Sequence, residues 1–173
     1  MKTLSDEPIA STGITWKSKL MTVAALGALP KPDVKLTIKS INVPRQPGPE
    51  RKTYRVRATL VKMKKEDDGD VHLVIADPGT AGKRMVVEFP DPNCDGAMKS
   101  KKRTSMASAR KALRDHCGAP PSSFKKGMLS GTATVKGVGF FDFLHAGDQA
   151  ENGIELHPVV GVWKIECVRL PPA

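Results

Sequence analysis

The chain has 173 residues, 39% hydrophobic and 27% charged, which is the composition of a folded domain and excludes an intrinsically disordered chain. Lys and Arg number 28 against 18 Asp and Glu, and the net charge of +10 favours a polyanionic partner such as nucleic acid, with solubility alone as the alternative. No apolar stretch is long enough for a membrane-spanning helix, and no signal peptide is evident.

We expect residues 1–50 to form an N-terminal arm and residues 51–173 to form the main domain. In the arm, large apolar side chains recur at an approximately helical spacing, which predicts a short helix over residues 16–29 that packs on the main domain. The proline-rich residues 44–49 predict an extended linker.

The main domain opens with three predicted strands joined by short turns. Residues 54–60 alternate between apolar and polar side chains, which is typical of a half-buried strand. Acidic residues and a glycine at 66–69 predict a hairpin turn into a second strand over 70–76. A third strand follows over residues 83–89, so the three form an antiparallel meander.

A helix and two further strands complete the predicted order. Residues 103–116 carry an apolar stripe and end before Gly118, as an amphipathic helix does. Strands are then expected over 132–143 and 159–168. The fold class is mainly β with one or two helices, and this order of elements predicts an OB-like five-stranded barrel, with a half-open β-sandwich as the alternative.

Two segments carry a resemblance to known proteins. One runs from Asp67 to Val74, and the other reads GVGFFDFLH from Gly137 and continues as NGIELHPV from Asn152. Together they resemble a family of small, largely uncharacterised bacterial proteins that are often secreted. The resemblance implies a secreted mature form, with the cytoplasm as the alternative, and no established activity.

The same resemblance implies a disulfide between Cys94 and Cys117, because relatives carry cysteines at similar positions. From the residues alone, the three cysteines are compatible either with one disulfide and one thiol or with three thiols.

A weaker similarity is to thermonuclease-like OB barrels, which also carry an Asp-Gly-Asp turn between their first two strands. Asp68, Gly69 and Asp70 occupy that place here. That pattern also requires an arginine on the third strand, and no arginine matches it, although Glu88 and Asp91 are present. Nuclease chemistry by that route is therefore disfavoured.

Histidines and carboxylates are concentrated in the distinctive segments. Such groups can act as general acid and base, or can hold a divalent metal that activates water. The alternative is that they only fix turns, and the Asp-Gly-Asp turn is expected to be an ordinary hairpin turn. No cofactor is expected, apart from a divalent metal if these residues bind one. The candidate catalytic residues are His72, His145, Glu155, His157, Asp70 and Asp142.

Basic residues cluster on the predicted helix, on its approach and on the outer face of the first strand. They suit contacts to phosphates without sequence readout. The candidate polyanion-binding residues are Arg55, Arg57, Lys101, Lys102, Arg103, Arg110, Lys111 and Arg114.

Three functions follow from these observations. The first is a basic OB-like module that binds nucleic acid or another polyanion without strong sequence specificity. The second is a metal- or His-dependent phosphodiesterase or nuclease. The third is a structural or interaction protein. The oligomeric state stays open.

Overall fold

The computed structural model describes residues 3–4, 13–34, 44–144 and 147–171. It is mainly β, as the sequence predicts. The described residues form six strands in one sheet and three α-helices, where the sequence predicted five strands and one or two helices. Among these residues, no helix has the length and apolar character needed to cross a membrane.

The main domain begins with the predicted meander. It consists of β2 (Lys52–Lys65), β3 (Val71–Ala76) and β4 (Arg84–Phe89), joined antiparallel in that order. Tyr54, Val56 and Ala58 face the core and are at most 1% exposed. Arg55 and Arg57 between them are exposed, so the alternation predicted from the sequence is confirmed.

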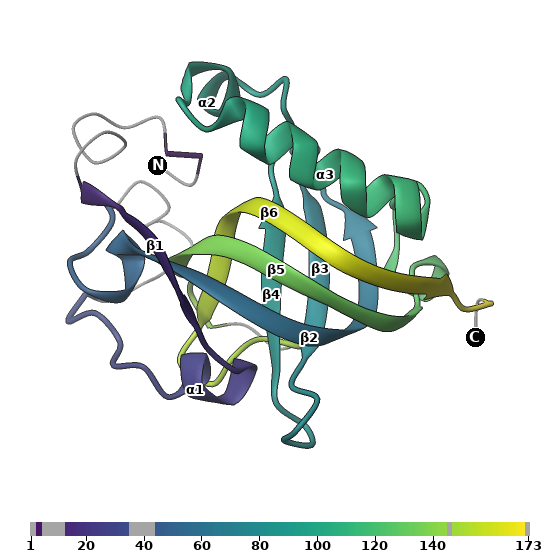
Figure 1. Ribbon diagram of the computed structural model, residues 1–173, viewed down its shortest axis with the longest axis horizontal. Coiled ribbons are helices and arrows are strands. Elements are labelled where there is room, and N and C mark those ends of the chain that lie inside the picture. Colours follow the sequence, from purple (N-terminus) through teal and green to yellow (C-terminus); the bar gives the residue numbers. More distant parts are fainter. Residues whose placement is uncertain (1–2, 5–12, 35–43, 145–146, 172–173) are drawn as a thin grey trace.

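The chain then forms α2 (Asp95–Lys99) and α3 (Arg103–Cys117), followed by β5 (Leu129–Phe141) and β6 (Ile154–Arg169). Helix α3 lies alongside β6, as Figure 1 shows, and buries its predicted apolar stripe of Met106, Ala109 and Leu113. Strand β6 begins five residues earlier than predicted, so Glu155 and His157 lie on a strand and not before one.

Hydrogen bonding between strands follows a ring, from β2 through β3, β4, β6 and β5 back to β2. The link between β4 and β6 is parallel and pairs Val87 with Leu156, whereas β5 is antiparallel to both β6 and β2. The main apolar core is made largely of the alternate side chains that these strands share with α3.

The predicted helix over residues 16–29 is wrong in its first half. Residues Thr15–Leu20 form β1, which pairs in parallel with the start of β2 and crosses the front of the molecule in Figure 1. The pairing satisfies backbone groups along the strand, and this outweighs an apolar spacing that is only approximately helical. A short helix, α1 (Val23–Gly27), follows and is capped by Thr22.

Residues of the predicted arm pack against the main domain. Val23 and Leu26 are at most 1% exposed and belong to the main core. In the predicted linker, the buried Arg45 guanidinium donates to the carbonyl oxygens of Gly139 and His157. A short turn of 3-10 helix, η3 (Pro49–Arg51), then leads into β2.

Candidate functional site

A buried cluster of acidic side chains surrounds His157, which is 1% exposed. Its Nδ1 atom lies 2.8 Å from Oε2 of Glu88 and 3.2 Å from Oε1 of Glu155. On the other side of the ring, Nε2 lies 3.5 Å from Oδ2 of Asp70. That last distance suits an ion pair but is too long for a good hydrogen bond.

Strand register explains why these residues meet. His72 and Glu88 are directly opposite each other on β3 and β4, so their side chains share a face. The parallel pairing of Val87 with Leu156 brings Glu88 beside the β6 residues on either side of Leu156. Glu155 and His157 are two residues apart on a strand and therefore point the same way.

Glu88 connects the two histidines. Its Oε1 lies 3.0 Å from Nδ1 of His72, while its Oε2 contacts His157. Glu66 approaches the same His72 nitrogen at 3.3 Å. The cluster is therefore a continuous chain of imidazoles and carboxylates that runs from the protein interior toward the surface.

Burial opposes a positive charge on His157, but the neighbouring carboxylates outweigh it. The negative charge of Glu88 is the largest of these effects, followed by the contacts with Asp70 and Glu155. Together they hold the pKa of His157 well above its ordinary value. The surrounding carboxylates therefore favour the protonated, positively charged form of this imidazole.

A pocket of about 500 Å³ opens onto this cluster. His72, Glu88 and Glu155 line its inner wall, and Phe124 of η4 (Phe124–Lys126) lines its rim. The ring of Phe124 contacts His72 edge-on and lies under the Lys62 and Lys64 ammonium groups. Charged groups of the cluster are therefore reachable from solvent through a rim that carries both signs of charge.

Four of the six predicted catalytic residues are brought together: Asp70, His72, Glu155 and His157. Asp142 lines the same pocket, where its Oδ1 accepts from the Phe143 backbone amide. His145 lies outside the described residues. Whether these groups catalyse a reaction stays a prediction.

Sequence reasoning left Glu88 out of the candidate site. The available signal was a single carboxylate within the otherwise apolar run Met85–Phe89, at a position that shares a face with His72 across the strand pair. An acidic side chain in a buried strand needs a partner, because burying an unpaired charge is costly.

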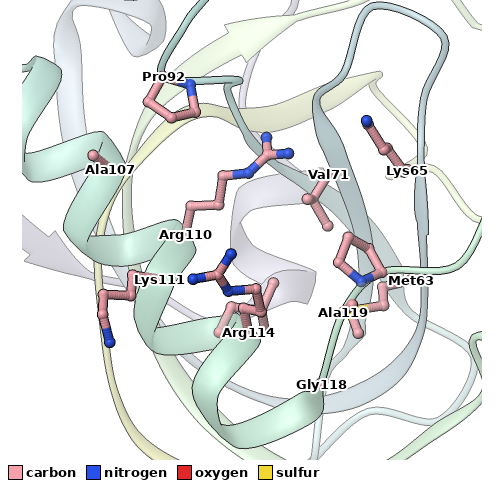
Figure 2. Close-up of a pocket in the computed structure, with 12 residues that line it drawn as sticks. Met63, Lys65, Val71, Pro92, Ala107, Arg110, Lys111, Arg114, Gly118 and Ala119 are labelled. Carbon is pink, nitrogen blue, oxygen red and sulfur yellow. The ribbon is translucent and has the colours of Figure 1, made fainter.

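A second pocket, of about 400 Å³, lies between α3 and the end of β2. Arg110 and Arg114 project into it from α3, and Lys65 lies on the facing strand, as Figure 2 shows. Lys111 lines its outer side and pairs with Asp115 at 2.5 Å. No carboxylate is among the described residues that line this pocket.

The eight predicted polyanion-binding residues lie in three groups on different elements. Arg110, Lys111 and Arg114 line the second pocket. Arg55 and Arg57 lie on the outer face of β2, opposite Lys136 and Thr134 of β5. The remaining three, Lys101, Lys102 and Arg103, lie just before α3 or at its first residue. The ammonium group of Lys102 lies 4.1 Å from the centre of the Trp16 ring.

The disulfide joins Cys117 to Cys167, so the expected Cys94–Cys117 pairing is wrong. Cys117 ends α3, and because this helix lies along β6, its last residue comes beside Cys167. Cys94 is a free cysteine at the start of α2, where its sulfur accepts from the amide of Ala97.

Comparisons with known proteins do not identify a relative in sequence. No family model matches the chain, and no curated protein is significantly similar to it. One similar solved structure is assigned as an aspartyl-tRNA synthetase from Leishmania major Friedlin, with a TM-score of 0.43 and 12% identity. The match covers 90% of this chain and 22% of that one, so this chain spans about a fifth of its length. So low a score supports no conclusion about fold or function, and the resemblance to a secreted bacterial family stays a prediction.

Proposed function

We propose that this protein binds nucleic acid or another polyanion through phosphate contacts, with the pocket between α3 and β2 as the main point of attachment. The observation that carries the proposal is the lining of this pocket, which includes Lys65, Arg110, Lys111 and Arg114 and no carboxylate among the described residues. Phosphate oxygens are the natural partners of such a set of guanidinium and ammonium groups.

The pocket is organised before any ligand binds. The Arg110 guanidinium donates to the carbonyl oxygens of Gly69 and Phe89, at 2.7 and 2.9 Å, which fixes its position. Arg114 lies one helical turn further on and faces the same space (Figure 2). A fixed charge beside a second guanidinium lowers the conformational cost of holding a phosphate group.

The order of strands supports the OB-like part of the proposal. In that fold a three-stranded meander, a helix and two further strands close into a small barrel. Here the ring of hydrogen bonds through β2, β3, β4, β6 and β5 follows the same order. Many such modules bind single-stranded nucleic acid by tracking its backbone.

Little sequence preference is expected, because the chain offers few exposed rings for base stacking. Tyr54, Phe140 and Phe141 are at most 7% exposed. Trp163 on β6 is 36% exposed and is the best stacking candidate. Binding should therefore depend mainly on phosphate charge and fall steeply as salt is raised.

The test is a fluorescence anisotropy titration with single- and double-stranded oligonucleotides of several sequences, at a series of salt concentrations. Lys65→Gln and Arg114→Gln should weaken binding to all of them alike and reduce the salt dependence. Lys52→Gln, an exposed lysine at the opposite end of β2, is the matched control. An affinity that does not change with salt, or equal losses in all three variants, would refute the proposed site.

The cluster around His157 favours a second candidate function, a phosphodiesterase or nuclease that uses the imidazoles and carboxylates as acid and base. Its support is the convergence of Asp70, His72, Glu155 and His157 beside an open pocket. Incubating labelled DNA and RNA with the protein, with and without divalent metal, tests it. Cleavage that disappears in Glu155→Gln would support this candidate, and the absence of cleavage under all conditions would reject it.

A further inference from the structure

One nitrogen inside the acidic cluster lacks the partner that its burial demands. The Nε2 atom of His157 has no hydrogen-bond partner among the described residues, although the side chain is 1% exposed. Its nearest charged neighbour is Oδ2 of Asp70, at 3.5 Å. A buried polar atom without a hydrogen-bond partner destabilises the folded state, unless a bound ion or water supplies the missing contact.

Three potential ligand groups lie around the His157 ring, with Asp70 on its Nε2 side and Glu88 next to Nδ1. Asp70, Glu88 and His157 each offer one nitrogen or oxygen atom, and these atoms all lie within 4.8 Å of one another. Ligands held about 2.1 Å from a common ion lie roughly 3–4 Å apart, so small rotations of these side chains suffice to enclose one. Glu88 and His157 lie on β4 and β6, and Asp70 directly precedes β3, so neighbouring strands of one sheet hold the three residues in place.

We propose that Asp70, Glu88 and His157 form a binding site for one divalent transition-metal ion of the Zn²⁺ or Mn²⁺ type. The site is separate from the pocket assigned to polyanions and does not depend on that function. An imidazole nitrogen with two carboxylate oxygens suits these ions, whereas Ca²⁺ and Mg²⁺ favour oxygen ligands alone.

The orientation of the imidazole supports this assignment. Its Nδ1 atom lies 3.2 Å from the Glu155 carboxylate, which can accept the Nδ1 proton and hold the ring. Binding of the ion would displace the Nε2 proton to solvent, and the electron pair that is freed faces the side on which Asp70 lies. A carboxylate that orients a histidine while its other nitrogen binds the metal is a recurrent outer-shell arrangement in metalloproteins.

The net charge of the cluster and its access to solvent also support a bound metal ion. Asp70, Glu88 and Glu155 contact His157, and Glu88 also contacts His72. The negative charge around His157 therefore exceeds what this imidazole can compensate even when it is protonated. A divalent ion corrects this excess. Glu88 and Glu155 also line the 500 Å³ pocket, which gives an ion a route from solvent.

The experiment uses the full-length protein after chelator treatment and dialysis. Co²⁺ is titrated as a spectroscopic probe, and Zn²⁺, Mn²⁺, Ca²⁺ and Mg²⁺ are compared by calorimetry. We expect one Co²⁺ per chain with a visible absorption band, displacement by Zn²⁺, and at least tenfold weaker binding of Ca²⁺ and Mg²⁺. Asp70→Asn and Glu88→Gln should each weaken Zn²⁺ binding at least tenfold.

Asp148→Asn is the matched control, because Asp148 lines the same pocket but pairs with Lys62 and Arg84. Metal binding should survive this change. The histidine ring signals of the unaltered protein give a readout that does not depend on whether the variants fold: Zn²⁺ should shift the nitrogen resonance of the His157 Nε2 atom. No saturable binding, no such shift, or equal loss in Asp148→Asn would overturn the proposal.

Discussion

Arg110 donates a hydrogen bond from its guanidinium to the carbonyl oxygen of Gly69 at 2.7 Å, which ties the middle of α3 to the turn before β3. The same side chain donates to Phe89 at the end of β4. A residue chosen from the sequence as a surface cation is therefore also a structural link between a helix and two strand ends.

We expect Arg110→Gln to lower the free energy of unfolding by about 1–3 kcal/mol, because two buried or half-buried carbonyl oxygens lose a charged donor. Arg114→Gln, one turn away, should leave stability nearly unchanged while weakening polyanion binding. Urea denaturation at neutral pH measures both variants. Equal stability of Arg110→Gln and the parent protein would contradict the structural role.

Reduction of the Cys117–Cys167 disulfide should destabilise the protein substantially. The two cysteines are separated by 50 residues, and closing a loop of that length corresponds to about 4 kcal/mol in the chain-entropy model. Cys117→Ser and Cys167→Ser should each show this loss, and a reducing agent should add nothing to it. Cys94→Ser is the control and should still respond to reductant. Thermal unfolding with and without the reductant provides the measurement.

Asp77 should make stability depend on pH in the acid range. Burial opposes its charge, but hydrogen bonds from the amides of Ala24, Gly79 and Thr80 and from the Thr22 side chain outweigh it and lower the pKa of Asp77 below 3.8. A depressed carboxyl pKa in the folded state contributes stability at higher pH, and this contribution disappears as pH falls through the folded-state pKa.

The test is Asp77→Asn. Because the amide carries no charge, the variant should be less stable than the parent by about 1–3 kcal/mol at pH 7. The gap should narrow below pH 3.8, because the carboxyl of the unfolded parent is protonated there before that of the folded parent. Urea unfolding at several pH values measures the difference, and a gap that is constant down to pH 3 would contradict the assignment.

Gly69 should tolerate substitution poorly for two reasons. Its φ is +91°, a conformation that favours glycine, and a Cβ atom there would lie 2.6 Å from Oδ2 of Asp91. Gly82 has a φ of +76° with no atom within 4 Å of such a Cβ, so Gly82→Ala isolates the backbone effect. We expect Gly69→Ala to cost about 1–3 kcal/mol, and more than Gly82→Ala, in the same unfolding assay.

Elements with a strong local period could be predicted from the sequence. In β2 and α3, the spacing of the apolar residues indicates directly which side chains face the core. Both elements therefore lie where the sequence predicts them. Residues 15–20 were misjudged because β1 is defined by its partner β2, and a pairing across more than thirty positions leaves no local pattern.

The candidate site was predicted only in part, for the same reason. Asp70, His72, Glu155 and His157 stood out because they lie close together in sequence in two unusual segments. Glu88 belongs to the site because of how β4 pairs with β3 and β6. This register between strands cannot be read from any short segment of the sequence. The Cys117–Cys167 bond likewise depends on how α3 lies along β6, a relationship between distant segments.

The parallel pairing of β1 with β2 has a consequence for solubility. A strand added outside a ring of paired strands carries backbone donors and acceptors on its outer side, and such an edge invites pairing with another molecule. Lys17 and Lys19 are exposed on β1, and their charges oppose the approach of a second, equally basic copy. We therefore expect electrostatic repulsion at this edge to disfavour strand pairing between copies of a protein rich in β-structure.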